Sequence, residues 1–82
     1  MEKLGALVFV QITEGASPLE VARALKDRPG VEEVMLISGQ WDLLIRFSYT
    51  NMDALSNFVV SHLRKINGVS KTDTTIILDK VK

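Results

Sequence analysis

The chain has 82 residues, which is enough for one small domain and leaves no room for a second one. Ten lysine and arginine residues balance ten aspartate and glutamate residues, so the formal net charge is zero and the sequence pI is about 6.6. This balance excludes the strongly basic surface typical of proteins that bind nucleic acid or anionic membranes. We therefore expect a single domain over residues 1–82, with no DNA-binding domain and no direct contact with nucleic acid.

Covalent and metal crosslinks are not available to this sequence. Cysteine is absent and His62 is the single histidine, so neither a disulfide nor a thiol and imidazole metal cluster can form. We expect no metal site and no cofactor. A domain of this size buries only about 60% of the surface of its unfolded chain. Oligomerisation is then the remaining source of additional burial, and we expect a homo-oligomer.

The sequence predicts neither a membrane span nor a secretory signal. The longest uninterrupted apolar run covers residues 6–10, whereas a helix needs about 20 apolar residues to cross a bilayer. The first residues include a glutamate and lead directly into this short run, unlike a signal peptide. We expect a cytoplasmic protein that does not contact membranes.

The first part of the chain predicts a strand and a helix. Leu4–Ile12 is short, rich in β-branched and aromatic residues, and apolar on both faces, which favours a central strand. Ser17, Pro18 and Glu20 have the spacing of a capping box that begins a helix, and Pro29–Gly30 ends it. The expected buried stripe of this helix consists of Leu19, Val21, Ala22 and Leu25.

The rest of the chain predicts two strands, a second helix and a last strand. Residues 31–38 and 41–49 are expected to form a hairpin around Gly39–Gln40. Asn51 is a suitable cap for the second helix, whose apolar spacing continues to Ile66 before Asn67–Gly68. Residues 69–81 contain many strand formers. The alternation in the third strand places Leu43, Ile45, Phe47 and Tyr49 on one face.

The order strand, helix, strand, strand, helix, strand predicts an α+β, ferredoxin-like βαββαβ fold. Its four-stranded antiparallel sheet carries both helices on one face. The first strand, however, is apolar on both faces. We therefore expect the open face of the sheet to pack against a second copy of the chain.

The sequence contains few candidates for catalysis. His62 lies in the second amphipathic helix, where it is either a histidine at the edge of the core or a general base. Glu32 and Glu33 are adjacent in a strand, so their side chains diverge and cannot share a proton. The glycines do not assemble into a phosphate-binding loop.

The segment Ser38–Asp42 stands out, because a hairpin turn rarely needs a tryptophan beside a carboxylate. In a structural role, Gly39 would supply a positive φ, Trp41 would cover the edge of the core, and Asp42 would cap the turn. In a ligand-binding role, backbone N–H groups of the turn would bind a carboxylate and Asp42 an ammonium group, while Trp41 excludes water. The candidate ligand-binding residues are Gly39, Gln40, Trp41 and Asp42, with Thr72, Thr74 and Thr75 from the same or a neighbouring subunit as the opposite wall.

Several ordered motifs together resemble the C-terminal effector domain, or RAM domain, of the Lrp/AsnC (feast/famine) transcription regulators. These are Pro29-Gly30-Val31, Ser38-Gly39-Gln40-Trp41-Asp42, Leu55 with Phe58, and Gly68-Val69-Ser70-Lys71-Thr72-Asp73-Thr74 followed by Ile77-Leu78. The resemblance covers nearly the whole chain. It implies a ferredoxin-like domain that dimerises through its sheet, assembles further into octamers or related rings such as decamers, and binds amino-acid effectors between dimers near the Gly39–Asp42 turn.

The resemblance has two departures. The helix-turn-helix half of the family does not precede the first strand, so we expect a stand-alone effector-binding module that acts on full-length Lrp/AsnC relatives by mixed assembly. Ser38 and Trp41 occupy positions where the family more often has a threonine and a smaller aromatic residue. The bulky indole either narrows the site, which favours a small amino acid, or plugs it.

Two alternatives use the same fold. One is a small cofactor-free enzyme of the dimeric ferredoxin-like barrel type, a monooxygenase or isomerase, for which His62 and Tyr49 are the only candidates. The other is an amino-acid-sensing domain of the ACT type, which would place its ligand at a glycine-rich turn after the first strand. Glu14-Gly15-Ala16 is a short version of such a turn.

Overall fold

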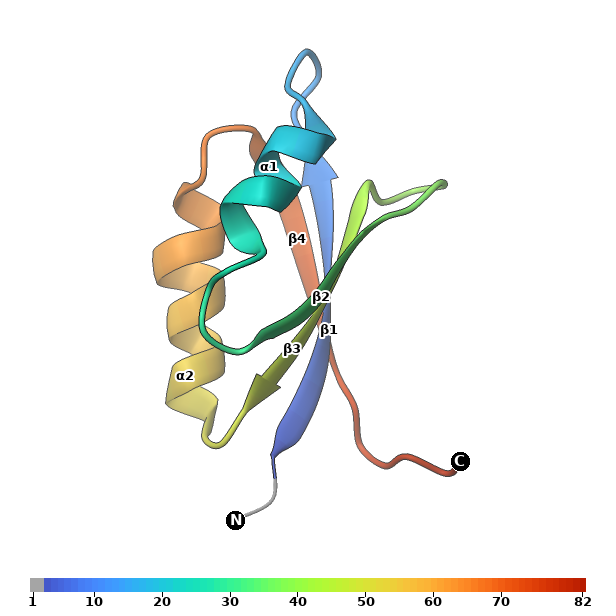
Figure 1. Cartoon of the computed structure of the whole chain (residues 1–82), viewed down its shortest axis with the longest axis vertical. Coiled ribbons are helices and arrows are strands. Elements are labelled where there is room, and N and C mark those ends of the chain that lie inside the picture. The colour runs from blue at the N-terminus through green and yellow to red at the C-terminus, as the bar shows by residue number, and fades with distance from the viewer. Residues whose placement is uncertain (1–2) are drawn as a thin grey trace.

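The computed structural model of the chain describes residues 3–82 (Figure 1). Met1 and Glu2, at the start of the predicted domain, lie outside the described residues. In chain order the elements are β1 (Leu4–Ile12), α1 (Pro18–Leu25), β2 (Val31–Leu36), β3 (Leu43–Tyr49), α2 (Met52–Ser56), a π-helix η1 (Asn57–His62), a 3-10 turn η2 (Leu63–Lys65) and β4 (Val69–Ile76).

The strands form one antiparallel sheet in the order β2-β3-β1-β4. Both helical segments cover the same face, and the other face is open (Figure 1). The predicted ferredoxin-like fold is therefore confirmed. Among the described residues, no helix is long and apolar enough to cross a membrane.

The core lies between the sheet and the helices, and the strand periodicity determines which side chains enter it. Alternate residues of β1 and β3 point toward the helices, as predicted from their spacing. The rings of Phe47 and Phe58 stack with a centroid distance of 4.4 Å, which joins β3 to the second helical segment. The buried core residues are Ala6, Val8, Val10, Ile12, Val21, Ala22, Leu25, Leu43, Ile45, Phe47, Tyr49, Leu55, Phe58 and Leu63.

Side-chain caps begin both helices. The hydroxyl of Ser17 accepts a hydrogen bond from the N–H of Glu20 at 3.2 Å. Similarly, the side-chain oxygen of Asn51 accepts one from the N–H of Ala54 at 2.9 Å. These contacts satisfy N–H groups that have no partner within a helix. The Glu20 carboxylate pairs with Arg23 at 3.4 Å.

The predicted burial of Leu19 in the apolar stripe of α1 is wrong, because this residue is 46% exposed. Val21, Ala22 and Leu25 are buried. At about 100° per residue, these three share one side of the helix, and Leu19 lies more than a quarter turn away from its centre. The stripe is therefore narrower than the sequence suggested.

The connection between α1 and β2 depends on Gly30. Its φ is +91°, and a Cβ atom there would lie 2.6 Å from the Phe47 ring and 2.9 Å from the carbonyl oxygen of Ser48. The N–H of Ser48 also donates to the Gly30 carbonyl at 2.8 Å. Only glycine fits this close approach to β3 without strain.

Three boundaries differ from the prediction. The hairpin strands end at Leu36 and begin again at Leu43, so the expected two-residue turn is a longer connection. Beyond these ends, the N–H of Ile37 still donates to the Asp42 carbonyl at 3.0 Å, and the N–H of Asp42 donates to Val10 of β1 at 2.9 Å. The last strand ends at Ile76 and not at Val81, although the N–H of Ile77 still donates to the Gly5 carbonyl of β1 at 2.9 Å.

The second helix is also not the continuous α-helix that the spacing predicted up to Ile66. After Ser56 it continues as the π-helix of Asn57–His62 and then as a 3-10 turn. Phe58 and Leu63 are still buried within these turns, so the hydrophobic contacts are kept while the backbone repeat changes. Hydrophobic spacing alone does not distinguish these helix types.

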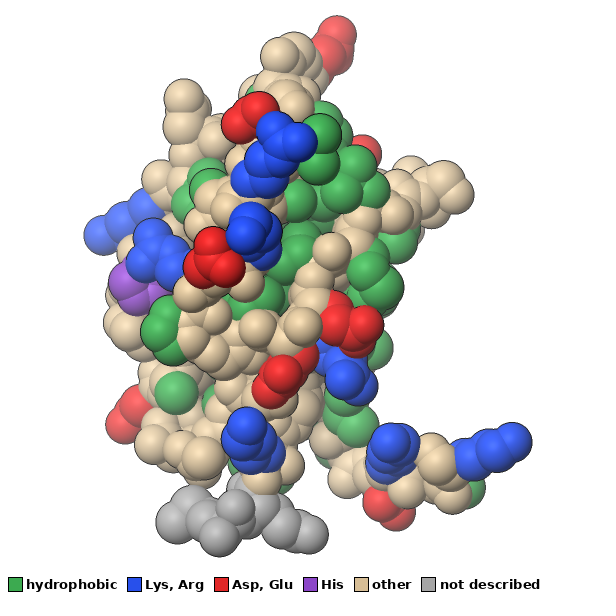
Figure 2. Space-filling view, viewed as in Figure 1, with side chains coloured by type: hydrophobic (Ala, Val, Ile, Leu, Met, Phe, Trp, Pro, Cys, Tyr) green, Lys and Arg blue, Asp and Glu red, His purple; other side chains and the backbone are tan. Residues whose placement is uncertain are grey.

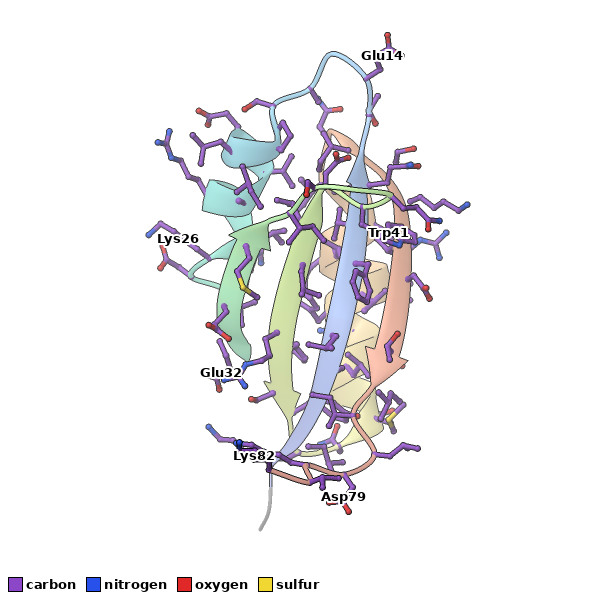
Figure 3. The ribbon with its side chains drawn as sticks, turned by 90° about the vertical axis from the view of Figure 1, so that its right-hand side faces the viewer. Glu14, Lys26, Glu32, Trp41, Asp79 and Lys82 are labelled. Carbon is purple, nitrogen blue, oxygen red and sulfur yellow. The ribbon has the colours of Figure 1, made fainter. Side chains whose placement is uncertain are left out.

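The open face of the sheet carries an apolar row (Figure 3). Phe9 of β1 pairs with Leu44 of β3, and Leu44 pairs with Met35 of β2, so these three side chains share the face. Leu7 lies on the same face beside Arg46, whose guanidinium Nε is 2.9 Å from the Glu33 carboxylate. Dimerisation through this face stays a prediction.

Candidate functional site

The connection between β2 and β3 positions Trp41 against the open face. Gly39 has a φ of +116°, a backbone conformation that favours glycine, and it helps the chain to reverse direction. A Cβ atom at this position would have no other atom within 4 Å, so glycine is needed here for its backbone conformation and not for space. The half-buried Trp41 ring lies 6.0 Å from the Phe9 ring, measured between centroids, with a tilt of 43°. Trp41 therefore extends the apolar row of Phe9, Leu44 and Met35 toward the turn (Figure 3).

Asp42 links three segments of the backbone. Its carboxylate Oδ2 accepts a hydrogen bond from the N–H of Ile12 at 2.7 Å. Its backbone N–H donates to Val10, and its carbonyl accepts from Ile37 at 3.0 Å. The carboxylate therefore caps the end of β1 and not its own turn, which corrects the structural role that the sequence suggested. The second carboxylate oxygen, Oδ1, has no hydrogen-bond partner among the described residues.

The three predicted threonines lie on β4 and are divided between the two faces of the sheet. Thr72 pairs with Val10 and Thr74 with Val8, so both lie on the helix-covered face. Thr75 pairs with Leu7 and lies on the open face. Strand β1 separates β4 from β3 and the turn. The two described pockets that are lined by these threonines, one by Thr72 and one by Thr74, include no residue of the Gly39–Asp42 turn.

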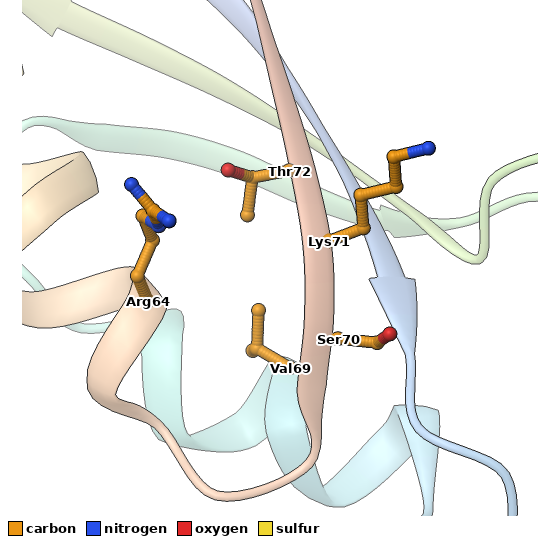
Figure 4. Close-up of a pocket in the computed structure, with 5 residues that line it drawn as sticks. All are labelled: Arg64, Val69, Ser70, Lys71 and Thr72. Carbon is orange, nitrogen blue, oxygen red and sulfur yellow. The ribbon is translucent and has the colours of Figure 1, made fainter.

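A cleft of about 350 Å³ opens where η2 meets the start of β4 (Figure 4). The Arg64 side chain extends from η2 toward the same gap as Thr72, while Ser70 and Lys71 point to the other side of the strand (Figure 4). Arg64 forms no ion pair among residues 3–82. Its guanidinium is a free donor for an anionic group, which sequence reasoning missed because Arg64 matches no motif.

The residues considered for catalysis do not form one site. The side chain of Tyr49 is 4% exposed and packs beside Phe47, with a ring distance of 6.3 Å. His62 is half-buried, and its ring contacts Arg28 and Asn57. No hydrogen bond joins His62 to Tyr49 in the part of the chain that the structure describes. Among the described residues, no three acidic, cysteine or histidine side chains are grouped so that they could hold a metal ion.

The protein family of the chain follows from a match along nearly its whole length. The model of the Lrp/AsnC ligand binding domain matches residues 5–82. The chain belongs to the Lrp/AsnC ligand-binding domain family. The resemblance inferred from the Gly39–Asp42 and Gly68–Thr74 motifs is thereby confirmed.

The relatives place this domain in two kinds of protein. An uncharacterised HTH-type transcriptional regulator of Pyrococcus abyssi is 36% identical over 83 residues, which cover 96% of this chain and 55% of the regulator. A homocitrate synthase of Sulfurisphaera tokodaii is 35% identical, with 98% of this chain and 17% of the enzyme covered. The chain thus spans about half the length of the regulators it matches and a sixth of the enzyme.

A solved structure also matches along nearly the whole domain. It is the complex of a Neisseria meningitidis transcriptional regulator with L-Met, with 28% identity and a TM-score of 0.87. The match covers 96% of this chain and 52% of the regulator. The chain is therefore a regulatory ligand-binding domain by sequence and by fold.

Proposed function

We propose that this chain is a non-enzymatic, oligomeric module that binds a small amino acid as a regulatory effector. The observation that supports this most strongly is the recurrence of the same domain in HTH-type regulators and in a homocitrate synthase. These proteins share neither DNA binding nor catalysis by their names, whereas a ligand-sensing domain is useful to both. The L-Met complex of the Neisseria meningitidis regulator supports an amino acid as the ligand class.

The proposed effector site lies between subunits. The Gly39–Asp42 turn and the β4 threonines lie on opposite sides of β1 within one chain, which supports assigning one wall to a neighbouring copy. At the turn, backbone N–H groups would bind the effector carboxylate, and the free Oδ1 of Asp42 would accept from its ammonium group. Gln40 and Trp41 would border the site. Thr75 of the neighbour, which lies on the open face, would supply a hydroxyl group on the opposite side, whereas Thr72 and Thr74 face the helices and do not share this wall.

The proposed dimer forms through the open sheet face. Phe9, Leu44 and Met35 form an apolar row there, and the Arg46–Glu33 ion pair borders it. The segment after β4 leaves the body on the same side (Figure 1), and its Leu78 is 94% exposed. Such an unpaired apolar surface is typical of an interface between copies. Dimers would assemble further into octamers or decamers.

The module is also proposed to enter mixed assemblies with full-length Lrp/AsnC regulators and to have no DNA contact of its own. The same sheet face would form the mixed dimer. The test is co-expression with a full-length relative, followed by native mass spectrometry. Mixed oligomers with bound amino acid are expected. Separate homo-oligomers would contradict mixed assembly, and an unchanged mass in every amino acid would contradict the effector proposal.

A further inference from the structure

A second cavity, unrelated to the proposed effector site, lies on the helix-covered side of the molecule. It has a volume of about 210 Å³ and opens between the α1–β2 connection and the second helical segment. The buried rings of Phe47 and Phe58 contribute its apolar floor. Arg28, Asn57 and His62 form its rim. His62, the purple side chain in Figure 2, lies at the surface beside basic side chains.

The π-helix brings two of these rim residues together. In an α-helix, residues five apart are separated by about 140° around the axis. In a π-helix, whose hydrogen bonds join residues five apart, the wider turn brings them to the same side of the axis. Asn57 and His62 are five apart, and the Asn57 side-chain nitrogen lies 3.5 Å from Nε2 of His62. The irregular turn therefore aligns both side chains with the cavity, and π-turns of this kind occur frequently at functional sites.

The rim carries more hydrogen-bond donors than acceptors. Nη1 of Arg28 lies 3.4 Å from Nδ1 of His62, and Asn57 faces the other ring nitrogen. A neutral imidazole has one acceptor nitrogen and one N–H, so it cannot accept from both neighbours. Rotating the Asn57 amide satisfies the ring but turns its NH₂ group outward as another donor. Arg28 forms no ion pair among residues 3–82, and no Asp or Glu lines the cavity.

We propose that this cavity binds a small monocarboxylate with an apolar body and no ammonium group. The carboxylate would accept hydrogen bonds from Arg28, Asn57 and His62, and charge-assisted bonds to a guanidinium are among the stronger ones. The apolar body would lie against the Phe58 and Phe47 rings. An α-amino acid is disfavoured, because its ammonium group would find donors and no acidic partner. The cavity is small enough to limit the body to about one ring or one branched chain.

The test is an NMR titration with phenylacetate as the probe. His62 is the only histidine, so its imidazole signals report on the cavity without ambiguity. Phenylacetate is expected to shift these signals saturably in the millimolar range. L-phenylalanine and 2-phenylethylamine, which share the ring but carry an ammonium group, are expected to bind at least about tenfold more weakly. An unchanged His62 spectrum at about 10 mM phenylacetate would overturn the proposal.

Variants connect any shift to the rim. Arg28→Gln is expected to weaken phenylacetate binding about tenfold, and Asn57→Asp to abolish it by placing a carboxylate on the rim. Arg23→Gln is the matched control, because Arg23 is also an exposed arginine but pairs with Glu20 on α1. Equal binding by the Arg28 and Arg23 variants would refute the site. Arg28→Gln should leave amino-acid binding at the Asp42 turn unchanged, so the two proposals can fail independently.

Discussion

The hydrogen bond from the Ile12 N–H to the Asp42 carboxylate gives Asp42 a structural role that can be separated from its proposed role in ligand binding. The distance is 2.7 Å, the acceptor is a carboxylate, and the donor belongs to a residue that is only 9% exposed. Hydrogen bonds to charged groups contribute about 1.5–3 kcal/mol. Asp42 is half-buried, so in the Asp42→Ala variant water can partly replace the carboxylate as the acceptor for the Ile12 N–H group. We therefore expect this variant to lose about 1.5–2 kcal/mol of free energy of unfolding, the lower part of this range.

The Asp42→Asn variant distinguishes the two roles. Its amide oxygen can still accept from Ile12, but its NH₂ group cannot accept from an ammonium group. Since charge-assisted bonds are roughly twice as strong as neutral ones, this variant should lose only about 0.7–1 kcal/mol. We therefore expect Asp42→Asn to fold nearly as stably as the wild type and to lose amino-acid binding. Asp42→Ala should lose both stability and binding.

Urea unfolding followed by far-ultraviolet circular dichroism measures the stability part, at one fixed protein concentration because subunit association also contributes. Native mass spectrometry measures the binding part. A stability of Asp42→Ala within about 0.5 kcal/mol of the wild type would show that the Ile12 contact does not stabilise the fold. Unchanged amino-acid binding by Asp42→Asn would remove Asp42 from the effector site.

Two further predictions concern the fold and the dimer. Gly30→Ala and Gly15→Ala both place alanine at a φ near +90°, but only the alanine at residue 30 would clash with the Phe47 ring. In urea unfolding, Gly30→Ala should therefore lose roughly 1–3 kcal/mol more free energy of unfolding than Gly15→Ala. Equal losses would contradict the steric argument. Phe9→Asp should raise the dimer dissociation constant at least about tenfold in analytical ultracentrifugation, whereas Leu19→Asp, at an exposed apolar residue on the helix side, should leave it unchanged. Equal effects of these two variants would refute the open face as the interface.

Local signals in the sequence were sufficient for the elements and their order. Ser17 and Asn51 could be recognised as helix caps because each accepts a hydrogen bond from the N–H group only three residues further along the chain. The alternation of β1 and β3 correctly assigned their buried faces, since a strand has a side-chain period of two. These features depend on neighbours in the chain, and the sequence therefore contains them directly.

The features that the sequence could not predict depend on distant residues. The partner of Asp42 is Ile12, thirty residues away, so the carboxylate could be placed at the turn but not assigned to β1. The π-helix of Asn57–His62 keeps Phe58 and Leu63 buried, and its hydrophobic spacing resembles that of an α-helix. Its contacts with Arg28 become visible only when α1 and the second helical segment are packed together.

For the proposed site, the Gly39–Asp42 turn and the β4 threonines show most clearly what could not be predicted from the sequence. Their motifs identified the family, which the match over residues 5–82 confirms. Sequence could not show that β1 separates Trp41 and Asp42 from Thr72 and Thr74 within one chain. This separation is the reason why we place the second wall of the proposed site on a neighbouring copy.

Whether the oligomer binds an amino acid at the Asp42 turn can be measured by native mass spectrometry of the wild-type protein and the Asp42→Asn variant, recorded with each of the twenty amino acids. We expect dimers or multiples of dimers that gain the mass of a small amino acid, and variant oligomers of the same size that gain none. A wild-type protein that stays monomeric, or whose oligomers gain no mass with any amino acid, would contradict this expectation.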